Sequence, residues 1–154
     1  MLQIKPFRQR IGFCGPVSLK LILEYFGIEK TEKEMAKLCG YKKLKGVGAK
    51  NILKAAKKLG LKGFIKDFSG IKDVRRYVIK KKIPVIVDWF SADEGHYSVV
   101  VDIDRENIYL QDPELGHPRA MRINDFKRVW FDFPGDFLRS KNDIVVRRLI
   151  VLYK

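Results

Sequence analysis

Cysteine is scarce in this chain of 154 residues, which contains only Cys14 and Cys39. Two cysteines are too few for a disulfide framework or for a zinc site built from thiolates. The two histidines are scattered and lack the spacing of metal ligands, so we expect neither a metal nor an organic cofactor. In a reducing cytosol both thiols should be free, which allows one of them to be reactive.

Long apolar segments are also missing. No stretch approaches the roughly 18 apolar residues of a membrane-spanning helix, and the N-terminus MLQIKPFRQR is charged where a signal peptide needs an apolar run. We therefore expect a cytoplasmic protein without a membrane span. The chain also lacks an internal repeat, a Gly/Ser linker and a phosphate-binding GxxxxGK[ST] loop, so we predict a single domain over residues 1–154.

Acidic residues are outnumbered by basic ones, 18 to 32, which gives a formal net charge of +14. One interpretation is a solvated, lysine-rich surface of the kind found in heat-adapted proteins. The other is attraction to an anionic partner such as nucleic acid. The sequence contains no recognisable nucleic-acid-binding motif, so nucleic-acid binding is only an alternative hypothesis. In that alternative the chain is a catalytically inactive, basic protein that contacts nucleic acid.

The first half of the chain has helical periodicity. Apolar residues follow helical spacing over residues 15–26, with Pro16 suited to the first turn and Gly27 to the left-handed position after the last. Thr31 and Glu34 have the spacing of a capping box, which predicts the start of a second helix. Further helical patterns cover residues 31–39, 49–59 and 71–81.

The second half changes to the alternation of β-strands. The runs PVIVDWF, HYSVVVDI and NIYLQDP are rich in β-branched and aromatic residues, and residues 104–106 predict a tight hairpin between the last two. Strands are also predicted over residues 117–123 and 144–153, with a short helix capped by Asn124 between them. Helices followed by strands indicate an α+β fold, in which N-terminal helices pack on a C-terminal antiparallel sheet.

Cys14 lies where the first predicted helix begins. There its thiolate would be stabilised by the positive end of the helix and by free backbone N–H groups, which favours a nucleophile. The alternative is an inert cysteine packed at the start of a helix. Gln9, a few residues earlier, can donate its side-chain amide to an oxyanion, with the backbone N–H of Cys14 as the second donor.

His96 and Asp112 lie at the outer ends of the two strands joined by the predicted hairpin. A turn at residues 104–106 brings the end of the second strand back beside the start of the first, and therefore places Asp112 next to His96. An aspartate there can orient an imidazole and stabilise the imidazolium that forms when a thiol ionises. The alternatives are a surface histidine and an Asp–Pro turn that only ends the strand.

The segment QRIGFCGPVSLKLILEYFG resembles the nucleophile helix of the bacteriocin-processing cysteine peptidases, which have a papain-like fold and cut leader peptides after a double glycine. GVGAKNILKAAKKLGLK is similar to a second block of that family, and HYSVVVDI with LQDP to its histidine and aspartate strands. The resemblance covers about residues 9–116. It implies four roles: the nucleophile Cys14, the general base His96, the orienting acid Asp112 and the oxyanion donor Gln9.

The residues and the resemblance together predict a papain-like cysteine peptidase, a thiol protease that hydrolyses a peptide or protein substrate, with a Gly-Gly leader as a candidate. An acyltransferase that uses the same triad is an alternative, because fold and triad do not choose the acceptor. Domains of this family usually belong to membrane transporters. We expect a stand-alone version here, because the sequence has neither spanning segments nor a nucleotide-binding loop.

Overall fold

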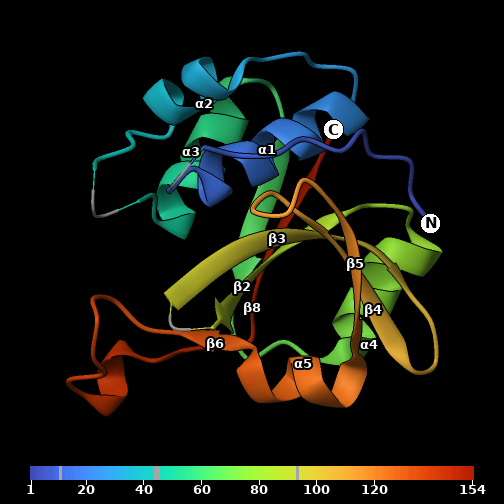
Figure 1. The fold of residues 1–154 in the computed structure, drawn as a ribbon. Coiled ribbons are helices and arrows are strands. Elements are labelled where there is room, and N and C mark those ends of the chain that lie inside the picture. The colour runs from blue at the N-terminus through green and yellow to red at the C-terminus, as the bar shows by residue number, and fades with distance from the viewer. Residues whose placement is uncertain (11, 44–45, 93) are drawn as a thin grey trace.

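The computed structural model describes residues 1–10, 12–43, 46–92 and 94–154. A six-stranded antiparallel sheet forms the centre, and helices cover both of its faces (Figure 1). One helical layer comprises α1 (Cys14–Tyr25), α2 (Glu32–Leu38) and α3 (Ala49–Lys58). The helices outside this layer are α4 (Ile71–Arg75), η1 (Arg76–Lys80), α5 (Ile123–Val129) and η2 (Lys141–Asp143).

The helix boundaries largely follow from local sequence signals. Gly27 adopts a φ of +84° after α1, as expected for a glycine that ends a helix. Thr31 and Glu34 form both hydrogen bonds of the predicted capping box at the start of α2. The predicted cap at Asn124 is wrong, because α5 begins at Ile123 and its N-cap residue Arg122 makes no side-chain capping hydrogen bond.

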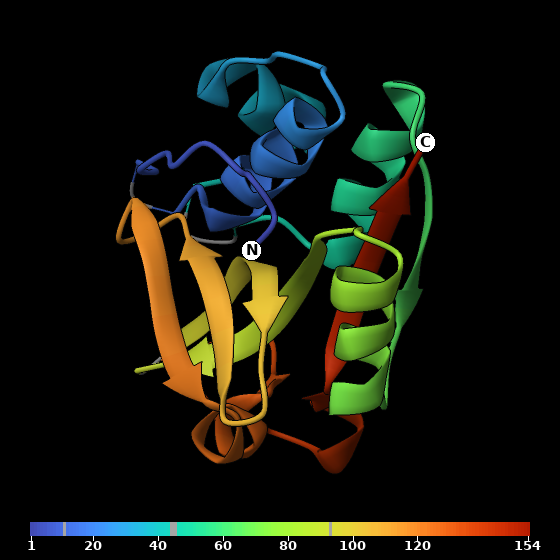
Figure 2. The ribbon, with the colours of Figure 1, turned by 90° about the vertical axis from the view of Figure 1, so that its right-hand side faces the viewer.

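The large sheet has the strand order β1-β8-β2-β3-β4-β5 and is strongly twisted (Figure 2). The strands are β1 (Lys62–Lys66), β2 (Val85–Ser91), β3 (Glu94–Ile103), β4 (Asn107–Asp112), β5 (His117–Arg122), β6 (Phe131–Asp132), β7 (Val145–Val146) and β8 (Arg148–Tyr153). The hairpin between β3 and β4 forms as predicted. β6 and β7 pair with each other in a separate two-stranded sheet.

Two features of the sheet differ from the sequence prediction. The first half is not purely helical, because the short segment KGFIK forms β1, whose glycine and terminal lysines give a weak strand signal. In addition, the strand predicted over residues 144–153 forms as two strands, β7 and β8, and β8 lies between β1 and β2 and pairs with both. These pairings join residues far apart in sequence, which local periodicity does not specify.

The core consists of two apolar clusters, one on each face of the sheet. The cluster under α1–α3 includes Leu19, Ile52 and Val99, none of which is exposed to solvent. The cluster on the other face lies against α4 and α5 and includes Val74 and Phe126. In the part of the chain that the structure describes, no helix has the length and apolarity needed to span a membrane.

Candidate active site

Cys14 is the first residue of α1 and is half-buried. Its N-cap residue, Phe13, has no side-chain acceptor and therefore does not cap the first-turn N–H groups of the helix. Gly15 lets this helix end approach its neighbours closely: a Cβ atom on Gly15 would lie 3.3 Å from Ile52 and 3.4 Å from Tyr97. The packing therefore fixes the thiol at the junction of the helical layer and the sheet.

His96 and Asp112 are brought together by the β3–β4 hairpin. His96 Nε2 lies 2.6 Å from Asp112 Oδ1, and both side chains are almost completely buried. The Cys14 side chain lies close enough to the same imidazole to raise the pKa of His96. His96 therefore has both the Asp112 carboxylate and the Cys14 thiol as neighbours.

The protonation states match this arrangement. Burial by itself lowers the pKa of His96, but the hydrogen bonds with Asp112 and Cys14 and the charges of both residues outweigh it and raise the pKa to about 10. Burial raises the pKa of Asp112, but the hydrogen bond and charge of His96 prevail and lower it overall. A protonated His96 beside an ionised Asp112 is therefore the favoured state at neutral pH.

Further residues hold Asp112 in place, and sequence analysis did not identify them. Arg119 Nη1 donates to Asp112 Oδ2 at 3.2 Å, and the Glu114 N–H donates to Oδ1 at 3.0 Å. The Arg119 guanidinium lies 5.5 Å above the ring of Trp89, which packs edge-on against His96. In the sequence, Arg119 lies in the predicted strand that follows the Asp–Pro turn, and this position could have indicated its role. The chain contains so many lysines and arginines that the sequence alone did not distinguish it.

Gln9 lies beside the turn that follows Asp112. Its backbone N–H donates to the Pro113 carbonyl at 2.8 Å. Its side-chain Oε1 is buried and has no hydrogen-bond partner among the described residues. Gly116, in the turn after Asp112, also lies close to the N-terminal segment, because a Cβ atom on Gly116 would be 2.7 Å from the Arg8 side chain. The N-terminal segment is thereby attached to the strand that carries Asp112.

One group of potential metal ligands is found in the described part of the chain. The ligand atoms of His96, Asp112 and Glu114 lie within 4.8 Å of one another. His96 Nε2 and Asp112 Oδ1 already bond to each other, and Arg119 occupies the second oxygen of Asp112. A cation would have to displace both contacts, so the geometry fits an oriented imidazole better than a metal centre.

Cys39 lies immediately after α2 and is 1% exposed. Burial raises the pKa of its thiol to about 12, so it stays protonated at neutral pH. The two cysteines therefore have different environments: Cys14 faces an imidazole, and Cys39 is packed in the apolar core.

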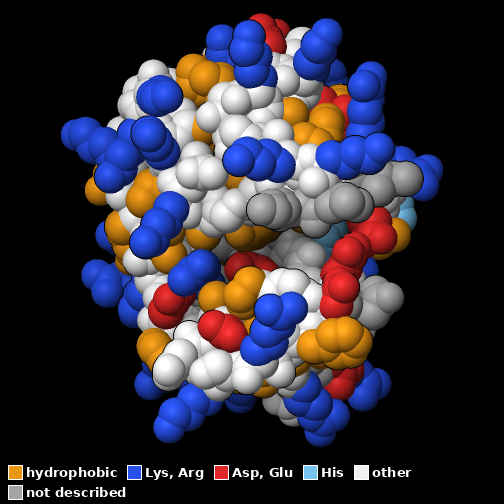
Figure 3. Space-filling model, turned by 90° about the vertical axis from the view of Figure 1, so that its left-hand side faces the viewer, with side chains coloured by type: hydrophobic (Ala, Val, Ile, Leu, Met, Phe, Trp, Pro, Cys, Tyr) orange, Lys and Arg blue, Asp and Glu red, His pale blue; other side chains and the backbone are white. Residues whose placement is uncertain are grey.

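Asp88 and Asp132 form an acidic pair, and Asp88 is close enough to Cys14 for the two side chains to interact electrostatically. A hollow between the helical layer and the lower part of the molecule has acidic side chains along it (Figure 3). Asp88 is buried, and Asp132 lies close enough to raise its pKa further. Asp132 also lies against Gly95, where a Cβ atom would collide with its carboxyl group. Asp88 therefore holds a proton more tightly than an exposed carboxyl does.

We expect Asp88→Asn to stabilise the protein. Burial, followed by Asp132, raises the pKa of Asp88 well above its ordinary value, so the folded state binds this proton more tightly than the unfolded chain. The resulting stability is lost as pH rises above about 3.9, the carboxyl pKa in unfolded chains. Asparagine can donate to Asp132 without a proton to lose, and should add about 1 to 3 kcal/mol to the free energy of unfolding at pH 7.

Denaturant unfolding at pH 5, 7 and 8 measures this effect, and the gain should grow with pH. Asp136→Asn, at an exposed position, is the matched control and should change stability by less than about 0.5 kcal/mol. A loss of stability in Asp88→Asn at all three pH values would show that Asp88 is ionised and compensated in the folded state.

Residues 9–133 match the Peptidase C39 family. An uncharacterised protein of Methanothermobacter thermautotrophicus is 32% identical over 125 residues, which cover 81% of this chain and 79% of the relative. An uncharacterised protein of Methanothermobacter marburgensis is 33% identical over 116 residues and covers 75% of each chain.

Solved structures share the fold. The peptidase domain of Streptococcus ComA, a bifunctional ABC transporter involved in quorum sensing, superposes with a TM-score of 0.77 at 21% identity, covering 97% of this chain and 98% of that domain. A double glycine motif protease from an AMS/PCAT transporter, in complex with the leader peptide, gives 0.71 at 20% identity and covers 98% and 91%. The fold is therefore the α+β, papain-like cysteine peptidase fold.

Proposed function

This chain belongs to the Peptidase C39 family of papain-like cysteine peptidases, and on that premise we propose that Cys14, His96 and Asp112 hydrolyse a peptide bond. The observation that carries the proposal is the buried His96–Asp112 contact, at 2.6 Å between Nε2 and Oδ1, with Cys14 close enough to raise the pKa of His96. Groups in this order are suited to forming and using a thiolate.

Each residue has a defined task in the proposed reaction. The proton of the Cys14 thiol resides on His96, and the thiolate attacks the carbonyl carbon of the scissile bond. His96 then donates this proton to the leaving amine, which departs and leaves a thioester on Cys14. Water attacks the thioester with His96 as base, and releases the acid. Asp112 keeps the imidazole oriented and stabilises its charged form throughout.

The oxyanion of the tetrahedral intermediate requires donors near Cys14. The first turn of α1 provides backbone N–H groups that the N-cap side chain does not cap, and the helix adds its positive end. We assign the side-chain amide of Gln9 as the second donor. The support is that its backbone N–H donates to the Pro113 carbonyl, in the turn after Asp112.

For the substrate we propose a peptide cut after Gly-Gly. The support is the structural similarity to a double glycine motif protease in complex with the leader peptide. Matched peptides that end in Gly-Gly or Gly-Phe before the scissile bond test this specificity. We expect the Gly-Gly peptide to be cleaved at least tenfold faster, and equal rates would contradict the specificity without affecting the assignment of the nucleophile.

The pH dependence of thiol alkylation tests the activated Cys–His pair. Because the pKa of His96 is raised to about 10, the imidazolium persists through neutral pH and would favour the reactive thiolate form of Cys14. We expect iodoacetamide to label Cys14 rapidly at pH 6, while Cys39, with a pKa of about 12, stays unlabelled in the folded protein. Peptide mass spectrometry distinguishes the two sites.

The two histidines provide a matched control for this experiment. His96→Ala should slow the labelling of Cys14 at pH 6 by about tenfold or more, whereas His117→Ala, at an exposed position of β5, should leave it unchanged. If Cys14 reacts equally in all three proteins, His96 does not activate it, and the proposed mechanism is wrong.

A further inference from the structure

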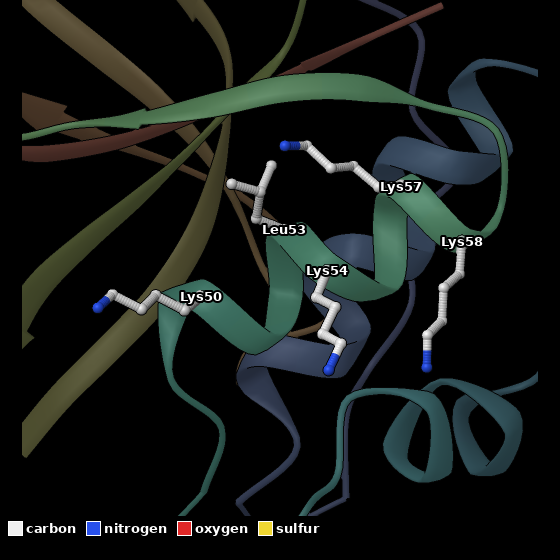
Figure 4. Close-up of a pocket in the computed structure, with 5 residues that line it drawn as sticks. All are labelled: Lys50, Leu53, Lys54, Lys57 and Lys58. Atoms are coloured by element: carbon white, nitrogen blue, oxygen red, sulfur yellow. The ribbon is translucent and has the colours of Figure 1, made fainter.

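A hollow on the outer face of α3 combines an apolar floor with a basic rim. Leu53 lies between lysines, with Lys54 and Lys58 pointing to one side of the helix and Lys57 to the other (Figure 4). The hollow is lined by Lys50, Leu53, Lys54, Lys57 and Lys58. All four lysines are exposed, and none of them belongs to the site around Cys14.

This surface continues onto α2. A neighbouring hollow shares Lys58 and adds two lysines and an exposed leucine from the α2 region. Its one acidic residue, Glu34, is already engaged in the capping box with Thr31. We call the combined surface the lysine groove, and it consists of Lys30, Lys37, Leu38, Lys50, Leu53, Lys54, Lys57 and Lys58.

The charges of the lysine groove are only weakly compensated: Glu34, which lines the same surface, interacts with Lys30 through its charge but forms no salt bridge with it among the described residues. In the described ranges of the chain, none of its six lysines lies within ion-pair distance of a carboxylate. Lys50 and Lys54 are separated by four residues, as are Lys54 and Lys58, so they repel along one helix face. Such like-charge pairs destabilise a helix by a few tenths of a kcal/mol each. A partner of opposite charge would relieve this repulsion between the lysines.

We propose that the lysine groove binds an acidic, amphipathic helix of another polypeptide. The lysines of α3 span eight residues, or about 12 Å along the helix, which matches carboxylates spaced four residues apart on a partner helix. Leucine or similar side chains of that helix would pack on Leu53 and Leu38, while its carboxylates meet the lysines on the rim. This is the helix-in-groove mode of recognition, with charge selecting the partner.

The two leucines of the lysine groove, Leu53 and Leu38, favour a polypeptide as its partner. Phosphates of a nucleic acid would use the lysines but leave Leu53 and Leu38 without a partner, and the groove contains no aromatic side chain on which bases could stack, among the residues that the structure describes. An anionic membrane would require protruding aromatic or leucine anchors, whereas Leu53 is half-buried. An acidic, amphipathic helix can both pack on the leucines and form ion pairs with the lysines.

The test uses a fluorescein-labelled probe peptide of about 18 residues, built from Leu, Ala and Glu so that it forms a helix with glutamates beside a leucine face. Fluorescence anisotropy at about 150 mM salt measures its binding to the full chain, where distant surface charges are largely screened. We expect the triple variant K54Q/K57Q/K58Q to bind about tenfold more weakly. The matched variant K72Q/K80Q/K127Q removes three exposed lysines elsewhere and should change affinity by less than about threefold.

Two control peptides and one competitor complete the experiment. Replacing the glutamates of the probe peptide by glutamine, or its leucines by serine, should each weaken binding by about tenfold. Equal losses in both triple variants would show only diffuse attraction to net charge and would overturn the proposal. It would also be overturned if single-stranded DNA bound more tightly than the probe peptide with the same dependence on Lys54, Lys57 and Lys58. Binding should persist in Cys14→Ala, because the groove is separate from the proposed catalytic residues.

Discussion

We expect Cys14→Ala to lower kcat for peptide hydrolysis by about 10⁴- to 10⁶-fold, the range found when an active-site nucleophile is removed. In the proposed mechanism the Cys14 thiol forms the acyl-enzyme, a role that His96 does not take over. The change removes one half-buried sulfur atom at a helix start and should leave the fold intact. Steady-state cleavage of a Gly-Gly peptide, followed by chromatography, measures the loss.

Cys39→Ala is the matched control, since it makes the same chemical change at the other cysteine. Cys39 is buried in the core cluster with its thiol protonated, so its loss should cost about 1 kcal/mol of stability and leave the rate unchanged. Hydrolysis that survives in purified Cys14→Ala protein with native circular dichroism would eliminate Cys14 as the nucleophile.

Asp112→Ala should lower kcat/KM by about 10²- to 10⁴-fold, because a triad histidine without its orienting acid adopts wrong tautomers and orientations. Asp112 also raises the pKa of His96, so the pKa should fall in the variant and the alkaline limb of the pH–rate profile should move to lower pH. Both the rate and the position of this limb are measured in one pH series.

Asp112→Asn distinguishes orientation from charge. The asparagine oxygen can still accept a hydrogen bond from His96 Nε2, but the negative charge is gone and Arg119 loses its ion pair. We expect a smaller fall in rate than for alanine, with a similar shift of the alkaline limb. Asp125→Asn, at an exposed position of α5, should alter neither quantity. If both Asp112 variants keep the original rate and pH profile, Asp112 has no role in orienting His96.

The sequence predicted the elements that present the proposed catalytic residues. Pro16 and Gly27 mark a helix that begins at Cys14, and β-branched alternation with a tight turn predicts the hairpin that carries His96 and Asp112. These signals are local, since caps, turns and side-chain periodicity depend on residues a few positions apart. For the same reason the juxtaposition of His96 and Asp112 could be expected from the hairpin register alone.

The tertiary structure alone decided what surrounds these residues. The insertion of β8 between β1 and β2, the support of Asp112 by Arg119 and Trp89, and the pairing of Asp88 with Asp132 all join separate elements. Sheet order is set by packing and hydrogen bonding between distant strands, and a carboxyl pKa by burial and neighbours. Local sequence patterns specify neither the order of the strands in the sheet nor the pKa of a carboxyl group. The sequence by itself therefore determined the order and type of most elements, though not of β1, whereas three-dimensional packing determined the environment of each reactive group.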